Sequence, residues 1–416
     1  MNSFWSKLRL KWFLATRSLN YGTDFVELLY RTYLNHNKII HFRDGRPVFS
    51  LMTPSLNSKP SAHFISRILF RSIQNRNFPN LMSFAVNDVC NAACEHCSFF
   101  SAVEEKGRQT LTLEQASQAI AEAQELGVSV INFVGGEPLM RKDFAALVSS
   151  VDKSLSTTIL FTNGWLLEER AAELKKAGLD SVFVSIDSAD PARHDEFRKT
   201  PGLFERAIQG IKLAKKLGFS VGFSATMTQE SWEQGELERI VELAKAVGVH
   251  EVFVFDAKPS GRYKDRLDLV DNQQWVEEMI QSAGRYNQDQ TYPGVVFLAY
   301  MTSYRSVGCS CGTSYFYLSP YGDMMSCDFN HAKFGNVIEE PLWKVWERLS
   351  TQPEFCKSKW GGCKIQDSQS RESESVCGSG CGSADESGLN NHACADGTCS
   401  SESVAGNDTM QQETEA

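Results

Sequence analysis

The sequence predicts an α/β protein whose centre is a partial (β/α)6 barrel, open on one side. Between residues 84 and 255, short β-like runs alternate with helical patterns, which is typical of βαβ units around a parallel sheet. A basic, aromatic-rich stretch precedes these units, and a cysteine-rich stretch follows them. We therefore expect a helical N-terminal extension, then the barrel, then a small C-terminal cysteine-rich cluster domain.

Strands and helices in alternation account for the barrel. The first predicted helix is well defined, because Thr112 and Gln115 have the spacing of a capping box and Gly127 is a typical helix stop. The predicted strands cover residues 84–89, 128–134, 157–162, 181–186, 219–226 and 252–255, and the predicted helices cover residues 112–126, 167–177, 204–217 and 237–247, with a further helix that ends near residue 151.

Composition excludes several classes of protein. The chain has 416 residues, 42% of them hydrophobic, which suffices for one large domain with appendages. The N-terminus lacks the continuous apolar segment of a secretory signal, and no run reaches the ~18 apolar residues needed to cross a bilayer. We expect a cytoplasmic protein whose twelve cysteines serve metal sites more than disulfides.

Charge is distributed unevenly along the chain, whose formal net charge is −9. Residues 1–80 contain twelve Lys or Arg against three Asp or Glu, with helical patterns at residues 4–14, 25–34 and 64–73. One interpretation is a peripheral contact of these helices with the anionic inner face of a membrane. The alternative is an extension that packs on the main domain. No nucleic-acid partner is expected, because apolar residues dilute the basic ones.

Three cysteines follow the first predicted strand. Cys90, Cys94 and Cys97 have the spacing C-x3-C-x2-C, so one loop can direct three thiols at a single object. Clustered thiolates are soft ligands that favour zinc or an iron–sulfur cluster. Zinc usually takes four protein ligands, and no obvious fourth ligand lies beside this trio. The pattern therefore favours a cubane cluster with one iron open to a substrate or cofactor.

Together with Gly135-Gly136-Glu137-Pro138 after the second strand, this motif resembles the radical S-adenosylmethionine (SAM) superfamily over residues 81–363. The resemblance implies a TIM-like partial barrel with its chemistry at the carboxyl ends of the strands. It also implies a [4Fe-4S] cluster on the three cysteines, whose open iron binds the amino and carboxylate groups of SAM. His96 is a departure, because the family usually has an aromatic residue before the third cysteine.

The resemblance also assigns SAM contacts to the strand ends. The Gly-Gly-Glu-Pro run would bind the methionine amino group, Ser185 and Asp187 would lie near the ribose or the carboxylate, and Arg262 near the methionine carboxylate. Structural alternatives exist: Asn163 belongs to a generic turn pair, Asp187 is a candidate helix cap, and Arg262 is a candidate for a surface ion pair. The implied cofactor-binding residues are Gly135, Gly136, Glu137, Pro138, Asn163, Ser185, Asp187 and Arg262.

A second group of thiols lies near the C-terminal end of the resemblance. The C-x10-G-x4-C spacing from Cys311 to Cys327 resembles the auxiliary-cluster region of SPASM and twitch enzymes. A hairpin predicted around residues 315–323 would bring these two thiols together. With Cys309 and Cys363 they could hold an auxiliary [4Fe-4S] cluster or, alternatively, a structural zinc.

The cysteines beyond this region depart from the family pattern. A full SPASM domain continues with C-x2-C-x5-C-x3-C, which is absent, so a single auxiliary cluster of the twitch type fits better and Cys356 is a spare thiol. The last segment has the composition of a disordered tail, in which Cys377, Cys381, Cys394 and Cys399 either form a small metal site or stay unorganised. The predicted domains are residues 1–80, 81–262, 263–367 and 368–416.

The resemblance implies a radical SAM enzyme that cleaves SAM reductively to a 5′-deoxyadenosyl radical, which abstracts hydrogen from a substrate. Auxiliary-cluster enzymes often modify peptides, whereas the basic aromatic N-terminus favours a lipid or lipid-linked substrate, so both stay open. A reduced flavodoxin or ferredoxin is the expected electron donor. The alternative of another class is a non-catalytic iron–sulfur or zinc scaffold, which would not need the SAM-binding run around Glu137.

Overall fold

The computed structural model describes residues 38–74, 76–99, 107–270, 273–303, 306, 308–352 and 363–366. These residues belong to one compact unit, Met1–Glu372. None of the described helices is both long and apolar enough to cross a membrane. The helices predicted at residues 4–14 and 25–34, the spare thiol Cys356 and the four tail cysteines lie outside the described residues.

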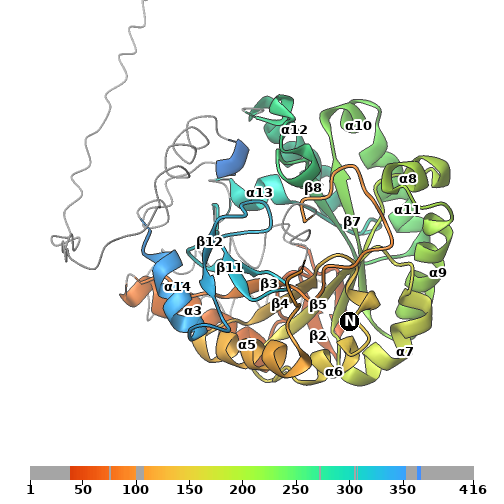
Figure 1. Ribbon diagram of the computed structural model, residues 1–416. Coiled ribbons are helices and arrows are strands. Elements are labelled where there is room, and N and C mark those ends of the chain that lie inside the picture. Colours follow the sequence, from red (N-terminus) through yellow and green to blue (C-terminus); the bar gives the residue numbers. More distant parts are fainter. Residues whose placement is uncertain are drawn as a thin grey trace, which may run out of the picture. The chain divides into compact units, whose positions relative to one another are not determined.

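A curved ten-stranded sheet forms the centre of this unit (Figure 1). Its order is β12-β11-β10-β3-β4-β5-β6-β7-β8-β9, and all neighbours from β10 to β9 run parallel, whereas β11 and β12 run antiparallel. Strands β3 to β8 are the six predicted strands, and they form a partial barrel as predicted. The strands are β3 Leu81–Ala85, β4 Val130–Val134, β5 Thr157–Thr162, β6 Ser181–Ser185, β7 Ser220–Met227, β8 Glu251–Asp256, β9 Gly294–Phe297, β10 Tyr315–Leu318, β11 Asp323–Met325 and β12 Lys333–Asn336.

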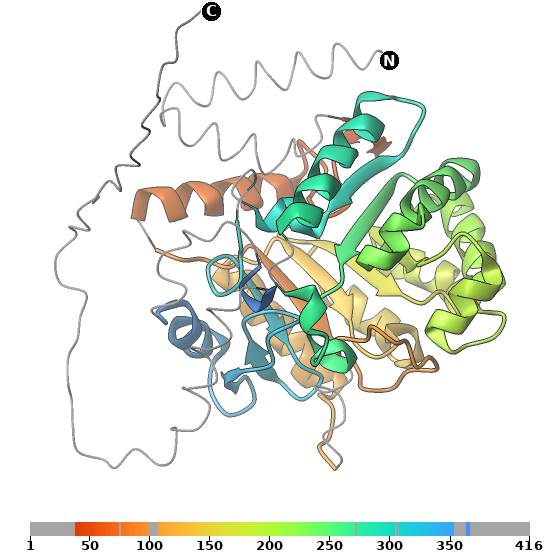
Figure 2. The ribbon, with the colours of Figure 1, turned by 90° about the horizontal axis from the view of Figure 1, so that it is seen from above.

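Helices cover the outer face of the sheet (Figures 1 and 2). Successive side chains of a strand point to opposite faces. In β4, Ile131 and Phe133 therefore pack into the main core under the helices, whereas Val130 belongs to a second apolar cluster. The helices are α5 Leu113–Leu126, α6 Phe144–Ser149, α7 Leu167–Ala177, α8 Pro191–Arg198, α9 Leu203–Lys216, α10 Gln229–Glu233, α11 Glu236–Val247, α12 Gln273–Gln288, α13 Leu298–Thr302 and α14 Leu342–Ser350, and the 3-10 turns are η1 Pro138–Met140, η2 Gly261–Tyr263, η3 Leu267–Leu269 and η4 Lys364–Gln366.

Local signals in the sequence explain most of these helices. The predicted capping box is present in α5, where the Thr112 hydroxyl accepts from the Gln115 amide nitrogen and Gly127 ends the helix. Helix α8 was not predicted, because its sequence PARHDEFR is too polar to show apolar periodicity. Its Asp190 side chain caps it instead, by accepting from two backbone amides.

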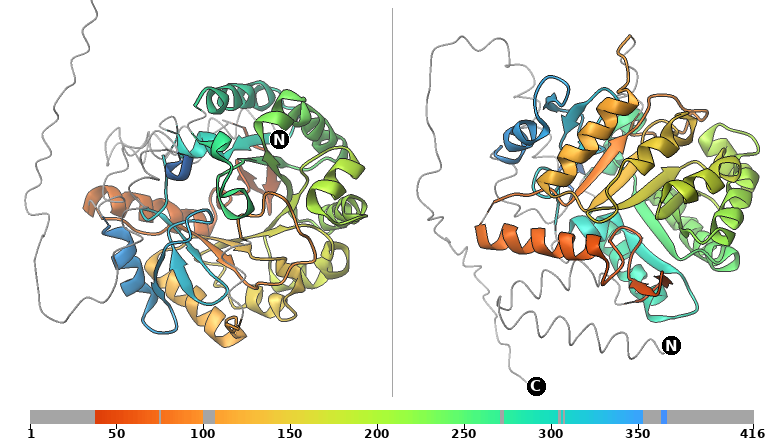
Figure 3. Two further views of the ribbon diagram at one scale, coloured as in Figure 1. Left: turned by 45° about the horizontal axis from the view of Figure 1, so that its top comes forward. Right: turned by 90° about the horizontal axis from the view of Figure 1, so that it is seen from below.

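The N-terminal segment packs against the barrel strands (Figure 3). Helix α3 (Lys59–Gln74) confirms the helix predicted at residues 64–73, and a hairpin of β1 (His41–Arg43) and β2 (Arg46–Val48) precedes it. Apolar residues of this segment share a cluster with interior residues of the barrel, Val130, Ile159, Phe183, Phe253 and Val296. The hairpin was not predicted, because strands of three residues are too short to show a period of two.

The auxiliary region continues the barrel sheet. The hairpin predicted around residues 315–323 is present as β10 and β11, with Tyr317 opposite Met325. Strand β10 also pairs in parallel with β3, the first barrel strand, where Tyr317 is the partner of Ser83. At the other edge, β9 pairs in parallel with β8. Both edge strands come from the segment that follows the predicted barrel.

Candidate active site

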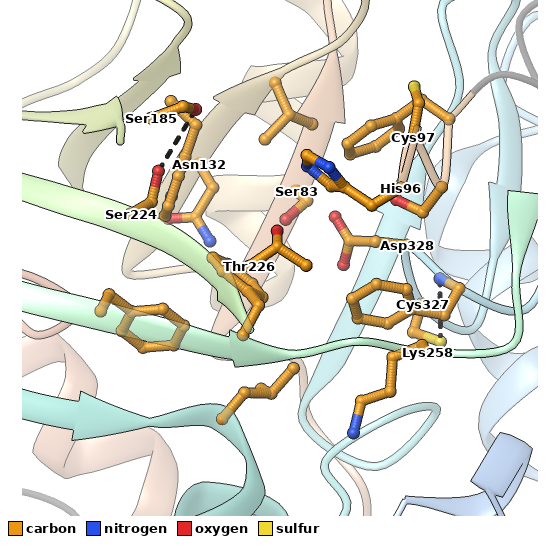
Figure 4. Close-up of a pocket in the computed structure, with 18 of the residues that line it drawn as sticks. Ser83, His96, Cys97, Asn132, Ser185, Ser224, Thr226, Lys258, Cys327 and Asp328 are labelled. Carbon is orange, nitrogen blue, oxygen red and sulfur yellow. Dashed lines mark hydrogen bonds between the residues drawn. The ribbon is translucent and has the colours of Figure 1, made fainter. Parts of the chain in front are cut away.

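A cavity of about 480 Å³ lies within the partial barrel and extends to the carboxyl ends of its strands. Part of its lining is shown in Figure 4. Aromatic and aliphatic side chains form much of the wall, among them Phe161, Phe253, Phe255, Leu298 and Met301. Both groups of predicted metal-binding cysteines line this same cavity: Cys90, Cys94, Cys97, Cys309, Cys311, Cys327 and Cys363.

The loop of the first cysteine group is held from two sides. The Arg262 guanidinium donates to the carbonyl oxygens of Ala93 at 2.5 Å and Cys94 at 3.1 Å, and its backbone nitrogen donates to the Cys97 carbonyl at 3.1 Å. On the other side, the Ala93 amide donates to the carbonyl of Arg198. Arg262 therefore braces the cysteine loop, and its predicted place near the methionine carboxylate stays a prediction.

Glycines allow a second loop to lie directly against the first. A Cβ atom on Gly136 would lie 2.2 Å from the Val89 carbonyl oxygen, and one on Gly135 would lie 2.8 Å from the Asn87 carbonyl oxygen. The backbone of Gly135 has φ +146, which favours glycine. The backbone of the Gly-Gly-Glu-Pro run after β4 thus lies in direct contact with the backbone that leads into the cysteine loop. Only glycine fits at positions 135 and 136.

Glu137 is buried at 1% exposure and ties three loops together. Its carboxylate accepts from the Thr162 hydroxyl at 2.6 Å, the Asn163 amide at 2.8 Å and the Leu139 amide at 3.1 Å. Burial raises the pKa of this carboxyl, while these donors oppose the rise. The Asn163 side chain also donates to Asn91 in the cysteine loop at 2.8 Å.

A buried ion pair stands beside the first cysteine group. The Arg198 guanidinium donates to the Asp187 carboxylate at 2.7 Å and lies 3.7 Å from the Cys94 sulfur. Burial lowers the pKa of Arg198, but the Asp187 carboxylate and the thiols of Cys94 and Cys90 together raise it above its usual value, so that Arg198 stays charged. Burial raises the pKa of Asp187, but Arg198, the neighbouring histidines and the Thr226 amide together hold it below its usual value. The pair thus places a fixed positive charge beside the thiols.

The second cysteine group also has close polar neighbours. The thiols of Cys309 and Cys327 each contact that of Cys311. The backbone amides of Phe329 and Asn330 donate to the Cys327 sulfur at 3.4 and 3.3 Å. Amide donors of this kind stabilise thiolate ligands.

Lys258 adds a positive charge to this group. Its fully buried ammonium pairs with Asp256 at 2.5 Å and faces Cys363 and Cys309. Three thiols in one loop and four thiols in the C-terminal region, with cationic neighbours at each, are a donor set that fits iron–sulfur clusters.

The structure brings together most of the predicted site residues. Besides the cysteines, Gly135, Gly136, Glu137, Asn163, Ser185 and Arg262 line the cavity. Pro138 and Asp187 are not among the lining residues: Pro138 begins η1, and Asp187 pairs with Arg198. His96, the departure from the family pattern, stacks on Phe197 with ring centroids 4.8 Å apart.

Among the lining residues that the sequence analysis missed, three have a clear place in the site. Arg198 ends a helix that was not predicted, so nothing pointed to it. Asn132 is the polar residue in the otherwise apolar strand Val130–Val134, a signal that was available. Asp328 directly follows Cys327, and its carboxylate accepts from the buried Tyr315 hydroxyl, whose oxygen lies 2.8 Å from the Ser83 hydroxyl and can accept from it.

Two family models match the chain: the Radical SAM superfamily over residues 85–244 and an iron-sulfur cluster-binding domain, SPASM, over residues 309–382. An AdoMet-dependent heme synthase of Methanosarcina barkeri is 30% identical over 316 residues, which are 70% of this chain and 90% of that protein. A PqqA peptide cyclase of Granulibacter bethesdensis is 27% identical, over 67% of this chain and 80% of that protein. The fold is similar to that of Streptococcus suis SuiB bound to S-adenosylmethionine, with a TM-score of 0.53 at 17% identity, over 72% of this chain and 76% of that one.

The chain belongs to the radical SAM superfamily. It is an enzyme, as predicted, and not a non-catalytic metal scaffold. Its cofactors are a [4Fe-4S] cluster and SAM, with an auxiliary iron–sulfur cluster in the C-terminal region. The second match ends at residue 382, so it includes Cys377 and Cys381, which lie beyond the predicted boundary at residue 367.

Proposed function

We propose that this enzyme modifies a substrate bound in the cavity between the two cysteine groups, by abstracting a hydrogen atom from it. The observation that carries this proposal is that the three thiols after β3 and the four C-terminal thiols line one cavity. When bound at the first group, the [4Fe-4S] cluster and SAM supply a 5′-deoxyadenosyl radical for this abstraction.

The residues at the strand ends have separate tasks in this scheme. Cys90, Cys94 and Cys97 would hold the first cluster, and Arg198 places a positive charge beside it. Glu137 accepts from Thr162 and Asn163 and so fixes the ends of β4 and β5 where SAM would bind.

The remaining predicted contacts complete this assignment. Gly135, Gly136, Asn163 and Ser185 line the cavity and would contact SAM, and Arg262 would act mainly by bracing the cysteine loop. Cys309, Cys311, Cys327 and Cys363 would hold the auxiliary cluster. A reduced flavodoxin or ferredoxin would deliver the electron.

A peptide is the substrate that we favour. The PqqA peptide cyclase among the relatives supports it. The second candidate is a tetrapyrrole. It is supported by the M. barkeri relative, which is named a heme synthase and which this chain covers over 90% of its length. The lipid alternative depended on the basic N-terminal helices, which lie largely outside the described residues.

The test is an anaerobic assay for 5′-deoxyadenosine. The protein is reconstituted with iron and sulfide, mixed with SAM and dithionite, and compared with a Cys94→Ala variant. We expect product from the parent and at least a hundredfold less from the variant, because two thiols cannot hold the cluster with an open iron. A parent protein that holds its clusters but forms no 5′-deoxyadenosine would contradict the proposal.

A further inference from the structure

A polar patch interrupts the apolar wall of the cavity, deep inside the barrel. Ser83 and Asn132 are direct register partners in β3 and β4, so their side chains leave the same face of the sheet side by side. In Figure 4, these two and Thr226 of β7 face a common space, with Asp328 on its far side. Aromatic and aliphatic side chains line the same cavity: Leu81, Val134, Phe161, Phe253, Phe255, Leu298 and Met301.

Asn132 is the unsatisfied member of this patch. The residue is 4% exposed, and its Oδ1 atom has no hydrogen-bond partner among the described residues. A buried amide oxygen without a partner is destabilising, and such groups are rare in folded proteins. Because Asn132 also lines the cavity, a ligand in the cavity is the natural partner of this oxygen.

The charges around the cavity favour a neutral ligand group. Among the described lining residues, the cationic side chains of Arg198, Lys258 and Arg262 already bind protein oxygens. Arg198 and Lys258 each pair with a buried carboxylate, at 2.7 and 2.5 Å, and Arg262 donates to two backbone carbonyls. Across the space from Asn132 stands the carboxyl of Asp328. A carboxylate or phosphate of the ligand would therefore lie near the acidic Asp328, while the three cationic side chains already bind protein oxygens.

We propose that Asn132 binds a carboxamide of the substrate, in a subsite that the Thr226 hydroxyl completes, and that the substrate is a peptide. An asparagine side chain both accepts and donates, so it pairs with an amide through one bond in each direction. The apolar wall takes up the carbon atoms on either side of the amide. This inference rests on the proposed function, because it names the substrate class of the same cavity.

The experiment measures binding to the enzyme loaded with its clusters and SAM, without reductant. Saturation-transfer NMR compares two probes, N-acetyl-L-alanine N-methylamide and N-acetyl-L-alanine. The first ends in an amide and the second in a carboxylate, and they are otherwise alike. We expect the amide to bind at least fivefold more tightly than the acid. Asn132→Leu, which keeps the shape and removes the polar atoms, should weaken amide binding at least fivefold.

A matched control comes from Asn80, another buried asparagine whose Oδ1 has no partner among the described residues. Asn80 is not among the cavity-lining residues, so Asn80→Leu should leave the affinity for the amide unchanged. If Asn132→Leu does not fold, Asn132→Ser replaces it, since serine removes the amide and keeps a polar group. Iron content and near-ultraviolet circular dichroism verify the fold of each variant.

The outcomes separate the subsite from the proposed function. Three results would each overturn the subsite: equal or tighter binding of the acid, binding of neither probe, or an unchanged affinity for the amide in Asn132→Leu. A preference for the acid would point to a tetrapyrrole or a lipid headgroup as the substrate. A parallel loss of SAM affinity in Asn132→Leu would also overturn it, because Asn132 would then be a SAM contact. The proposed function fails separately, if the parent forms no 5′-deoxyadenosine with dithionite.

Discussion

Gly136 and Val89 mark the closest approach of two chain segments at the first cysteine group. The amide after Gly136 donates to the Val89 carbonyl at 2.7 Å, and there is no room for a side chain between the two strands' loops. This backbone contact sets the position of the cysteine loop relative to Glu137. The site can form only because residue 136 is a glycine and has no Cβ atom.

Replacing Gly136 with alanine should disturb both the fold and the first cluster. The new Cβ would lie 2.2 Å from a backbone oxygen, so the loops must separate, at a cost of about 2 kcal/mol or more in the free energy of unfolding. We expect a lower melting temperature and less iron bound per chain. Gly284→Ala is the control, because a Cβ there meets no atom within 4 Å. Full iron content and an unchanged melting temperature in Gly136→Ala would contradict the packing argument.

The hairpin of β1 and β2 is attached to the barrel through buried polar groups as well as apolar ones. The rings of His41 and His250 stack with centroids 4.0 Å apart, and the Arg43 guanidinium donates to Ser181 at 2.5 Å and Ser220 at 2.9 Å. Burial lowers the pKa of His41 to about 3 and that of His250 to about 4. Both imidazoles are therefore neutral in the folded protein at neutral pH.

This element should make stability depend on pH. In the unfolded chain both histidines gain protons below about pH 6.5, whereas in the folded chain they stay neutral down to about pH 4. The unfolded state thus binds more protons, and the free energy of unfolding falls as the pH falls through this window. We expect a loss of about 2 kcal/mol from each histidine between pH 7.5 and pH 5, or about 4 kcal/mol from the pair.

Urea unfolding at these two pH values measures the effect. His41→Phe keeps an aromatic ring against His250 and removes one of the two titrating groups. The variant should therefore lose less stability than the parent on acidification. An equal loss in both proteins would place the pH dependence elsewhere in the chain.

The barrel and the auxiliary region share one sheet and one core. Strand β10 pairs with β3, and its Phe316 and Leu318 belong to the same apolar cluster as Phe84 and Phe133 of the barrel. Lys258 of the barrel side also reaches Gln366 at 2.5 Å. The four C-terminal thiols are therefore positioned by the barrel itself, and the two cysteine groups cannot be expected to fold apart.

Two truncations test this coupling. A chain that ends at residue 308 lacks β10 to β12, exposes the edge of β3 and opens the core, so we expect it to be insoluble or to lose its near-ultraviolet circular dichroism. A chain that ends at residue 372 keeps the whole compact unit and should melt within a few degrees of the parent. A soluble, folded chain ending at residue 308 would show that the auxiliary region is an independent module. Less iron per chain in the variant that ends at residue 372 than in the parent would show that the tail thiols bind metal.

The amino-acid sequence alone was enough to predict the six β/α units, the capped helix α5, both groups of cysteines and the run around Glu137. These features are local: they depend on side-chain periodicity, on turn residues and on the spacing of ligands along the chain. Arg198 and Asp328 could be recognised as lining residues only once the fold was known, whereas Asn132 was already visible as the polar residue of an apolar strand.

The three-dimensional fold was needed to show which strands flank the six barrel strands and which buried polar groups find partners. Pairing of β10 with β3 joins segments that are far apart in the sequence, and no local pattern encodes that choice. Asp187 was predicted at the SAM site, and the fold pairs its carboxylate with Arg198. The Oδ1 atom of Asn132 is left without a hydrogen-bond partner among the residues that the structure describes. The physical reason is the same in each case: a buried polar group is satisfied by whatever the fold brings beside it, and the sequence order does not specify that neighbour.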